Sequence, residues 1–293
     1  MICLSTGSLY TFGLARVFDL AAQVGFDGME VLIDRRWDTR TPSYLRHLSR
    51  EYGLPLVALH NPFDLDVPGW PFDQKERLAR TASLARELEI PVVVAHLPFR
   101  FYALILQWHG PRHRRIMLPI LWPRREAYFH LLRGEGLPQM EADLGVTIAV
   151  ENMPDRRFFG LSLPFYWFNR LDLLGRFPHV TLDTTHLGTW GLDPVEAYRR
   201  LGTKVRHVHL SNYDGREHRS PPNGRLGLDT LLHALDGDGY SGAVSVECAP
   251  DALDADDVAR CRTALKRAVA FCRAHYVGGR HPLLAKALGS GVQ

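Results

Sequence analysis

The stretch VTIAVEN at residues 146–152 decides the fold, because it joins a β-branched apolar run to an acidic end. A strand with so many apolar residues in succession is typical of a parallel sheet that is covered by helices on its faces. A carboxylate at the end of such a run has few structural reasons to be there. Residues 146–152 therefore predict a buried parallel strand that presents Glu151 at its carboxyl end.

Seven further short apolar runs occur along the chain, and longer amphipathic stretches such as residues 72–89 and 254–276 separate them. The other strand ranges are 2–6, 28–34, 55–60, 91–96, 179–186, 205–212 and 242–247. Glycines near the helix ends predict the turns back into strands, at Gly25, Gly53, Gly145 and Gly239. Eight strands that alternate with helices predict a closed (β/α)₈ TIM barrel.

One domain suits the 293 residues, of which 46% are hydrophobic and 23% are charged. We expect the barrel in residues 1–278 and a C-terminal tail in residues 279–293. Residues 99–132 are rich in aromatic residues, proline and arginine, and they predict an insertion after the fourth strand. An insertion there fits a lid or a substrate wall, and a surface subdomain or a dimer contact fits equally well.

Composition also bears on location and partners. A net charge of +3 is small for this length and argues against a general preference for nucleic acid or anionic membranes. The four cysteines form no CxxC pair, which fits a reducing cytoplasm, and there is no export signal or apolar stretch of roughly 18 residues. We expect a cytoplasmic protein without membrane contact. The apolar run at residues 116–122 fits either a homo-oligomer contact or a lid hinge.

Side chains that commonly bind metals stand at the carboxyl ends of six predicted strands. They are His60, His96, Glu151, Asp183, His209 and Glu247. Because these strand ends converge on one mouth of a barrel, residues far apart in the sequence can surround the same point. Several buried carboxylates repel one another unless a cation neutralises them. The sequence therefore predicts a divalent metal at the barrel mouth.

Two ligand sets remain open. The first is rich in oxygen and suits Mn²⁺, Mg²⁺ or Co²⁺. It comprises Glu151, Asp183, His209 and Glu247. A second set of histidines would favour Zn²⁺, although a single histidine at a strand end is more often a hydrogen-bonded core residue. It comprises His60, His96, His186 and His218. His207 shares a strand face with His209 and could replace it, but the later position favours His209.

Six motifs together resemble the xylose isomerase-like barrel superfamily. They are VALHNP (57–62), VVVAHLP (92–98), IAVENMP (148–154), VTLDTTHLGTWG (180–191), VRHVHLSNYDG (205–215) and SVECAP (245–250). The resemblance covers most of the chain, and only residues 99–132 are foreign to it. This superfamily contains sugar and sugar-phosphate isomerases and epimerases, together with the endonuclease IV class, also called AP endonuclease family 2.

The isomerase and epimerase branch implies a metal that is held by the oxygen-rich set. Glu151 and Glu247 would be the acid and base on opposite sides of a substrate carbon, while the metal stabilises a cis-enediolate. His186 and Arg216 would position substrate oxygens. The resemblance thus implies an enzyme that acts on a small polyol, ketose or related hydroxy-carbonyl compound.

The endonuclease IV branch implies three zinc ions and cleavage of a phosphodiester, such as that of abasic DNA. Its additional ligands would fall on His60, His96, His186 and His218, which are all present. That branch has an aspartate two residues before the last histidine, where this chain has Arg216. We therefore expect an isomerase or epimerase, and a nucleic-acid partner only in the alternative case of a zinc phosphodiesterase.

Overall fold

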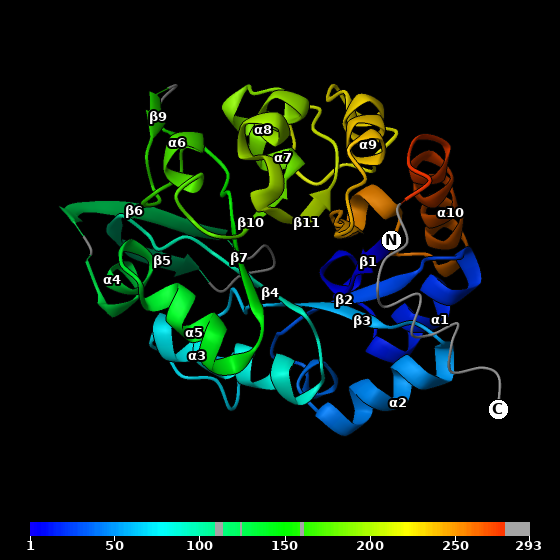
Figure 1. The fold of residues 1–293 in the computed structure, drawn as a ribbon, viewed down its shortest axis with the longest axis horizontal. Helices are drawn as coiled ribbons and strands as arrows, with labels where there is room; N and C mark the ends of the chain where they lie inside the picture. Colours follow the sequence, from blue (N-terminus) through cyan, green and yellow to red (C-terminus); the bar gives the residue numbers. More distant parts are fainter. Residues whose placement is uncertain (109–113, 124, 159–160, 279–293) are drawn as a thin grey trace.

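Eight parallel strands close into a barrel in the computed structural model, which describes residues 1–108, 114–123, 125–158 and 161–278. Their order around the barrel is β1, β12, β11, β10, β7, β4, β3 and β2 (Figure 1). Their bounds are β1 (Ile2–Ser5), β2 (Gly28–Leu32), β3 (Leu56–His60), β4 (Val92–Ala95), β7 (Thr147–Glu151), β10 (Val180–Asp183), β11 (Val205–Leu210) and β12 (Ala243–Val246). The predicted TIM barrel is confirmed, and the expected tail at 279–293 lies outside the described residues.

Helices cover the outside of the barrel, and those between successive barrel strands make the crossovers (Figure 1). Their bounds are α1 (Leu14–Val24), α2 (Pro42–Tyr52), α3 (Gln74–Glu87), α4 (Ala127–Arg133), α5 (Gly136–Leu144), α6 (Leu171–Leu174), α7 (Thr184–Trp190), α8 (Pro194–Leu201), α9 (Leu228–Gly237) and α10 (Val258–His275). Gly25, Gly53 and Gly145 end helices in the left-handed conformation, as predicted, and Gly239 also has a positive φ.

Side-chain caps set two boundaries that the sequence placed differently. The helix predicted from residue 254 begins at Val258, because Asp257 caps α10 by accepting the backbone N–H groups of the first turn. The strand predicted over residues 179–186 ends at Asp183, whose carboxylate accepts the backbone N–H of His186 at 2.8 Å and caps α7. His186 therefore lies on a helix and not on a strand.

The predicted insertion forms an antiparallel hairpin of β5 (Phe101–Trp108) and β6 (Arg114–Pro123), drawn at the left of Figure 1. Its base is joined to the segment after β7, where the Arg100 N–H donates to the Phe165 carbonyl at 2.6 Å. A shorter hairpin, β8 (Arg156–Phe158) with β9 (Leu161–Leu163), also follows β7. Within the range predicted for the insertion, α4 begins at Ala127 and buries Tyr128 and Phe129.

The apolar core lies mainly between the strands and the surrounding helices. A smaller apolar cluster joins the amino-terminal parts of β1, β3 and β12, and it consists of Met1, Cys3, Val57, Ala58 and Ala243. Buried polar side chains, by contrast, gather toward the carboxyl ends of the strands. Among the described residues, no helix is both long enough and apolar enough to span a membrane.

Candidate metal centre

The four residues of the oxygen-rich set meet at the barrel mouth. Their potential ligand atoms all lie within 4.8 Å of one another. His209 stands at the centre, because its Nδ1 lies 2.9 Å from Glu151 Oε1, 3.1 Å from Glu247 Oε2 and 3.8 Å from Asp183 Oδ2. Strands β7, β10 and β11 and the residue after β12 thus bring Glu151, Asp183, His209 and Glu247 together, as expected from barrel closure.

His60 and His96 face the other oxygen of Glu151. Their Nε2 atoms lie 3.7 and 3.5 Å from Glu151 Oε2. The His60 Nδ1 donates to the Asn61 carbonyl at 3.0 Å, which leaves the His60 Nε2 lone pair free. These two nitrogens and Glu151 Oε2 are buried without a hydrogen-bond partner in the described part of the chain. Two buried nitrogens and a carboxylate oxygen without hydrogen-bond partners are suited to bind a cation.

His186 and His218 lie on the other side of the centre. Their potential ligand atoms and that of Asp183 are also within 4.8 Å of one another. The His186 Nδ1 contacts the Asn152 carbonyl at 2.8 Å, and the His218 Nδ1 contacts the Glu247 carbonyl at 3.2 Å. His218 adopts a φ of 57°, a left-handed conformation that costs free energy for a residue other than glycine.

Arg216 does not face this histidine pair. Its side chain is 68% exposed and pairs with Asp214 at 2.9 Å. The hydrogen bonds from Arg216 lower the pKa of Asp214 to about 2. The two side chains therefore neutralise each other at the surface, and residue 216, an arginine, supplies no carboxylate that could join His186 and His218 as a ligand.

The electrostatics of the oxygen-rich set call for a cation. Burial raises the pKa of Asp183 well above its usual range, and the charge of Glu151 adds to this effect. Burial alone would lower the pKa of His209, but the carboxylates of Glu247, Glu30 and Glu151 outweigh burial and raise it strongly. A divalent cation at this point would favour the ionised form of Asp183 and the neutral form of His209, because its charge would offset that of the carboxylates.

Two of the flanking histidines, His96 and His186, are suited to be neutral ligands. Burial lowers the pKa of His96 to about 3 and that of His186 to about 4. Both imidazoles are therefore uncharged near neutral pH, and each keeps a nitrogen lone pair. Neutral imidazole is the form that binds metal ions.

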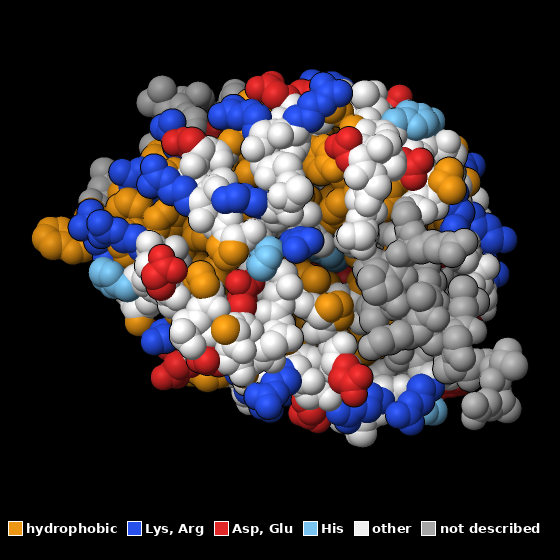
Figure 2. Space-filling model, viewed as in Figure 1, with side chains coloured by type: hydrophobic (Ala, Val, Ile, Leu, Met, Phe, Trp, Pro, Cys, Tyr) orange, Lys and Arg blue, Asp and Glu red, His pale blue; other side chains and the backbone are white. Residues whose placement is uncertain are grey.

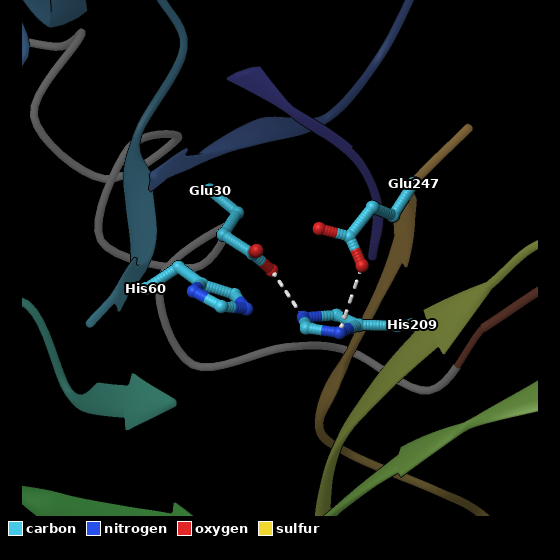
Figure 3. A group of neighbouring side chains, drawn as sticks. All are labelled: Glu30, His60, His209 and Glu247. Atoms are coloured by element: carbon cyan, nitrogen blue, oxygen red, sulfur yellow. Dashed lines mark hydrogen bonds and ion pairs between the residues drawn. The ribbon is translucent and has the colours of Figure 1, made fainter. Parts of the chain in front are cut away.

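Glu30 is a site residue that the sequence analysis missed. It lies in β2 and is fully buried. Its Oε2 accepts hydrogen bonds from the Nε2 of His207 and from the Nε2 of His209, the second of which is drawn in Figure 3. The signal was a carboxylate inside the apolar run GMEVL, but Glu30 stands within this run and not at its end. The structure also separates the two histidines of β11. His209 contacts the carboxylates of the centre, whereas the contact of His207 with a carboxylate is to Glu30.

The fold and the side chains at its mouth define a TIM barrel with a candidate metal centre. The chain belongs to the xylose isomerase-like TIM barrel family, whose model matches residues 18–268. It is similar to an uncharacterised protein of Mycobacterium leprae, with 29% identity over 267 residues that cover 83% of this chain and 87% of the relative. A protein of Mycobacterium tuberculosis is 29% identical over 269 residues, with the same coverage.

Solved structures share the fold at low sequence identity. The 3-keto-D-glucoside 4-epimerase YcjR from E. coli has a TM-score of 0.64 at 18% identity, covering 93% of this chain and 98% of its own. D-psicose 3-epimerase from Clostridium cellulolyticum has a TM-score of 0.62 at 14% identity, covering 93% and 98%. An AP endonuclease family 2 protein from Brucella melitensis has a TM-score of 0.61 at 18% identity, covering 85% and 93%. These likenesses show the fold.

Proposed function

We propose that the protein is a divalent-metal-dependent isomerase or epimerase that acts on a small sugar or a sugar-like hydroxy-carbonyl compound. The observation that carries this proposal is the position of two carboxylates around one imidazole. Glu151 and Glu247 approach His209 Nδ1 at 2.9 and 3.1 Å from strands on either side of β10 and β11. Epimerases of 3-keto-D-glucosides and of D-psicose among the structural neighbours support the same reaction class.

The metal would be held by Glu151, Asp183, His209 and Glu247, a set whose oxygen content favours Mn²⁺, Mg²⁺ or Co²⁺. When bound, it supplies Lewis acidity to the carbonyl and hydroxyl oxygens of the substrate. Asp183 Oδ2 and Glu151 Oε2 are buried without a hydrogen-bond partner among the described residues, so each has an oxygen free for a ligand. This donor set fits a hard divalent cation.

The two glutamates would carry out the proton transfer. One carboxylate removes the proton from the carbon beside the carbonyl, and the C–H electron pair enters the double bond of a cis-enediolate. The other glutamate returns a proton to the opposite face, which inverts that carbon. Glu247 is 8% exposed and Glu151 is fully buried, so Glu247 is the more accessible of the two from the barrel mouth.

The test is proton exchange on a panel of ketoses in D₂O, followed by NMR, with protein loaded with Mn²⁺ or with Mg²⁺. We expect deuterium at the carbon beside the carbonyl, and a fall in its rate of about 10³-fold in Glu247→Gln and in Glu151→Gln. A matched control is Glu141→Gln, because Glu141 is also a largely buried carboxylate, with a side chain 12% exposed, and it pairs with a histidine, His179, at 2.7 Å. Full activity of either site variant on an identified substrate would refute the acid–base assignment.

A zinc phosphodiesterase is the second candidate, and the unpartnered Nε2 atoms of His60 and His96 favour it. These atoms face Glu151 Oε2, so His60, His96 and Glu151 would hold a cation beside the oxygen-rich set, and it would supply Lewis acidity for phosphodiester hydrolysis. The AP endonuclease family 2 neighbour from Brucella melitensis supports the same alternative. On the face drawn in Figure 2, however, basic and acidic side chains are interspersed, whereas a phosphate backbone favours a basic surface.

Metal analysis of the purified protein separates the two candidates. One ion of the Mn²⁺ type per chain, without cleavage of an abasic DNA duplex, agrees with the isomerase or epimerase. Two or more zinc ions per chain, together with cleavage of that duplex, would establish the phosphodiesterase instead. A cytoplasmic location and a homo-oligomeric state stay predictions from the sequence.

A further inference from the structure

Glu30 has no role in the proton transfer proposed above, although it is one of the most deeply buried carboxylates of the chain. We infer that Glu30 is a positioning residue, which holds His209 with the proton on Nε2 so that the Nδ1 lone pair points at the metal position. This inference rests on the proposed metal centre. It assigns to β2 a part in the site that is otherwise built from β7, β10, β11 and the end of β12.

The hydrogen bonds of Glu30 separate it from the ligand carboxylates. Its Oε1 accepts from the Ser5 hydroxyl at 3.1 Å, and its Oε2 accepts from His207 Nε2 and from His209 Nε2 at 3.1 Å. Glu151 and Asp183 each keep one oxygen that is buried without such a partner in the described residues. Both oxygens of Glu30 are therefore occupied by the protein itself, whereas Glu151 and Asp183 each have one free for a cation.

The protonation state of the imidazole follows from these contacts. A carboxylate that is surrounded by three donors acts only as an acceptor, so the His209 Nε2 must carry a proton. The opposite nitrogen, Nδ1, faces Glu151, Glu247 and Asp183, as the contact to Glu247 in Figure 3 illustrates. Without an acceptor at Nε2, the ring is free to place its single proton on Nδ1, where the same carboxylates accept it and the metal cannot bind.

A competing arrangement would make Glu30 a ligand. Glu30, His60, His209 and Glu247 also have potential ligand atoms within 4.8 Å of one another (Figure 3). A cation bound there by the His209 Nε2 and Glu30 Oε2 would require this nitrogen to lose its proton and this oxygen to give up two imidazole donors. The central position among Glu151, Asp183 and Glu247 requires neither change, so the geometry points to Glu30 as the outer carboxylate.

The test compares Glu30→Leu and Glu30→Gln in the full-length chain. Leucine removes the acceptor, and glutamine keeps an acceptor oxygen without the charge. The first measurement is the ¹⁵N and ¹H NMR signal of the His209 Nε2–H in the metal-free protein. The second measurement is the affinity for Mn²⁺ by calorimetry. Loss of a carboxylate that supports a ligand lowers metal affinity by about 10-fold to 100-fold.

We expect the wild type to show a hydrogen-bonded Nε2–H signal, which is absent in Glu30→Leu and partly kept in Glu30→Gln. Affinity for Mn²⁺ should fall in the same order, with Glu141→Gln unchanged as the control carboxylate–histidine pair. If Glu30→Leu fails to fold, the signal and affinity of Glu30→Gln decide. An unchanged affinity in the folded variants, with normal binding by the wild type, would overturn this inference alone. A wild type that binds no metal would overturn the proposed function as well.

Discussion

Two pairs of histidines lie beside the central carboxylates, and they differ in how their ring nitrogens are held. His60 and His96 point unpartnered, buried Nε2 atoms at Glu151 Oε2. On the other side, the His186 nitrogen that faces Asp183 Oδ2, at 3.5 Å, is Nδ1, which already contacts the Asn152 carbonyl, and no unpartnered buried nitrogen is found in His186 or His218. The presence of four histidines in the sequence therefore does not make four equivalent ligands.

This difference teaches that the ring nitrogen that faces the carboxylate decides whether a histidine pair can hold a cation. Both pairs face an unpartnered carboxylate oxygen, Oε2 of Glu151 and Oδ2 of Asp183, but only in the first pair are the facing nitrogens unpartnered as well. The endonuclease IV branch has an aspartate beside its last histidine. This chain has Arg216 at that position, which pairs with Asp214. We therefore expect the first pair, and not the second, to take up a further cation when Zn²⁺ is in excess.

The largest effect is expected when the carboxylate that serves both the centre and the first pair is removed. Glu151→Gln should weaken binding of Mn²⁺ and of Zn²⁺ by more than about 100-fold. Loss of a carboxylate that only supports a ligand costs up to about 100-fold in affinity, and loss of a direct ligand should cost more. Metal titration by calorimetry measures this change, with Glu141→Gln as control. Wild-type affinity in a folded Glu151→Gln protein would show that the centre lies elsewhere.

A matched pair of double variants tests the difference between the histidine pairs directly. In excess Zn²⁺, the wild type should take up a second zinc equivalent at His60 and His96, and His60→Ala with His96→Ala should abolish it. His186→Ala with His218→Ala should keep both equivalents. Zinc per chain after gel filtration, measured by mass spectrometry, gives the answer, and the reverse pattern would contradict the comparison.

A smaller effect concerns the loop that carries His218. The guanidinium of the neighbouring Arg219 binds both oxygens of Asp251 at 2.9 and 3.0 Å, and these bonds lower the pKa of Asp251. Because Asp251 is largely exposed, Asp251→Asn should reduce the free energy of unfolding by about 1 kcal/mol or less at pH 7. A lowered pKa stabilises the fold above the unfolded value of 3.8 and less as the pH falls. The difference between the wild type and Asp251→Asn in the free energy of unfolding should therefore be smaller at pH 3 than at pH 7. Denaturation curves of both proteins at the two pH values measure it, and a difference that does not change with pH would exclude the ion pair as the cause.

The smallest effect is expected at Arg216. Arg216→Ala removes only an exposed ion pair with Asp214, so zinc content and Mn²⁺ affinity should stay at wild-type values. The free energy of unfolding should change by less than about 0.5 kcal/mol. If zinc content rose in this variant, the charge of Arg216 would be what excludes a further cation, as the sequence alone suggested.

Residues 146–152 illustrate how far the sequence reaches into the site. The apolar run with its acidic end correctly predicted a buried parallel strand, and barrel closure then brought Glu151 to the same point as Asp183, His209 and Glu247. The same reasoning passed over Glu30, because a charge inside a strand run gives no sign of which partners the barrel interior offers it. The strand predicted over residues 179–186 was too long. The Asp183 carboxylate caps α7 and so ends the strand, and this cap depends on backbone geometry that the sequence does not show.

The sequence by itself determined the TIM barrel and the set of carboxylates and histidines at its mouth. Strand periodicity and strand ends are local properties of the chain, so they can be found without coordinates. Only the tertiary structure decided which atoms face one another: that Glu151 is shared, that Glu30 holds His209 through Nε2, and that Arg216 turns to Asp214. These contacts join residues as much as 179 positions apart, and only closure of the barrel sets their distances.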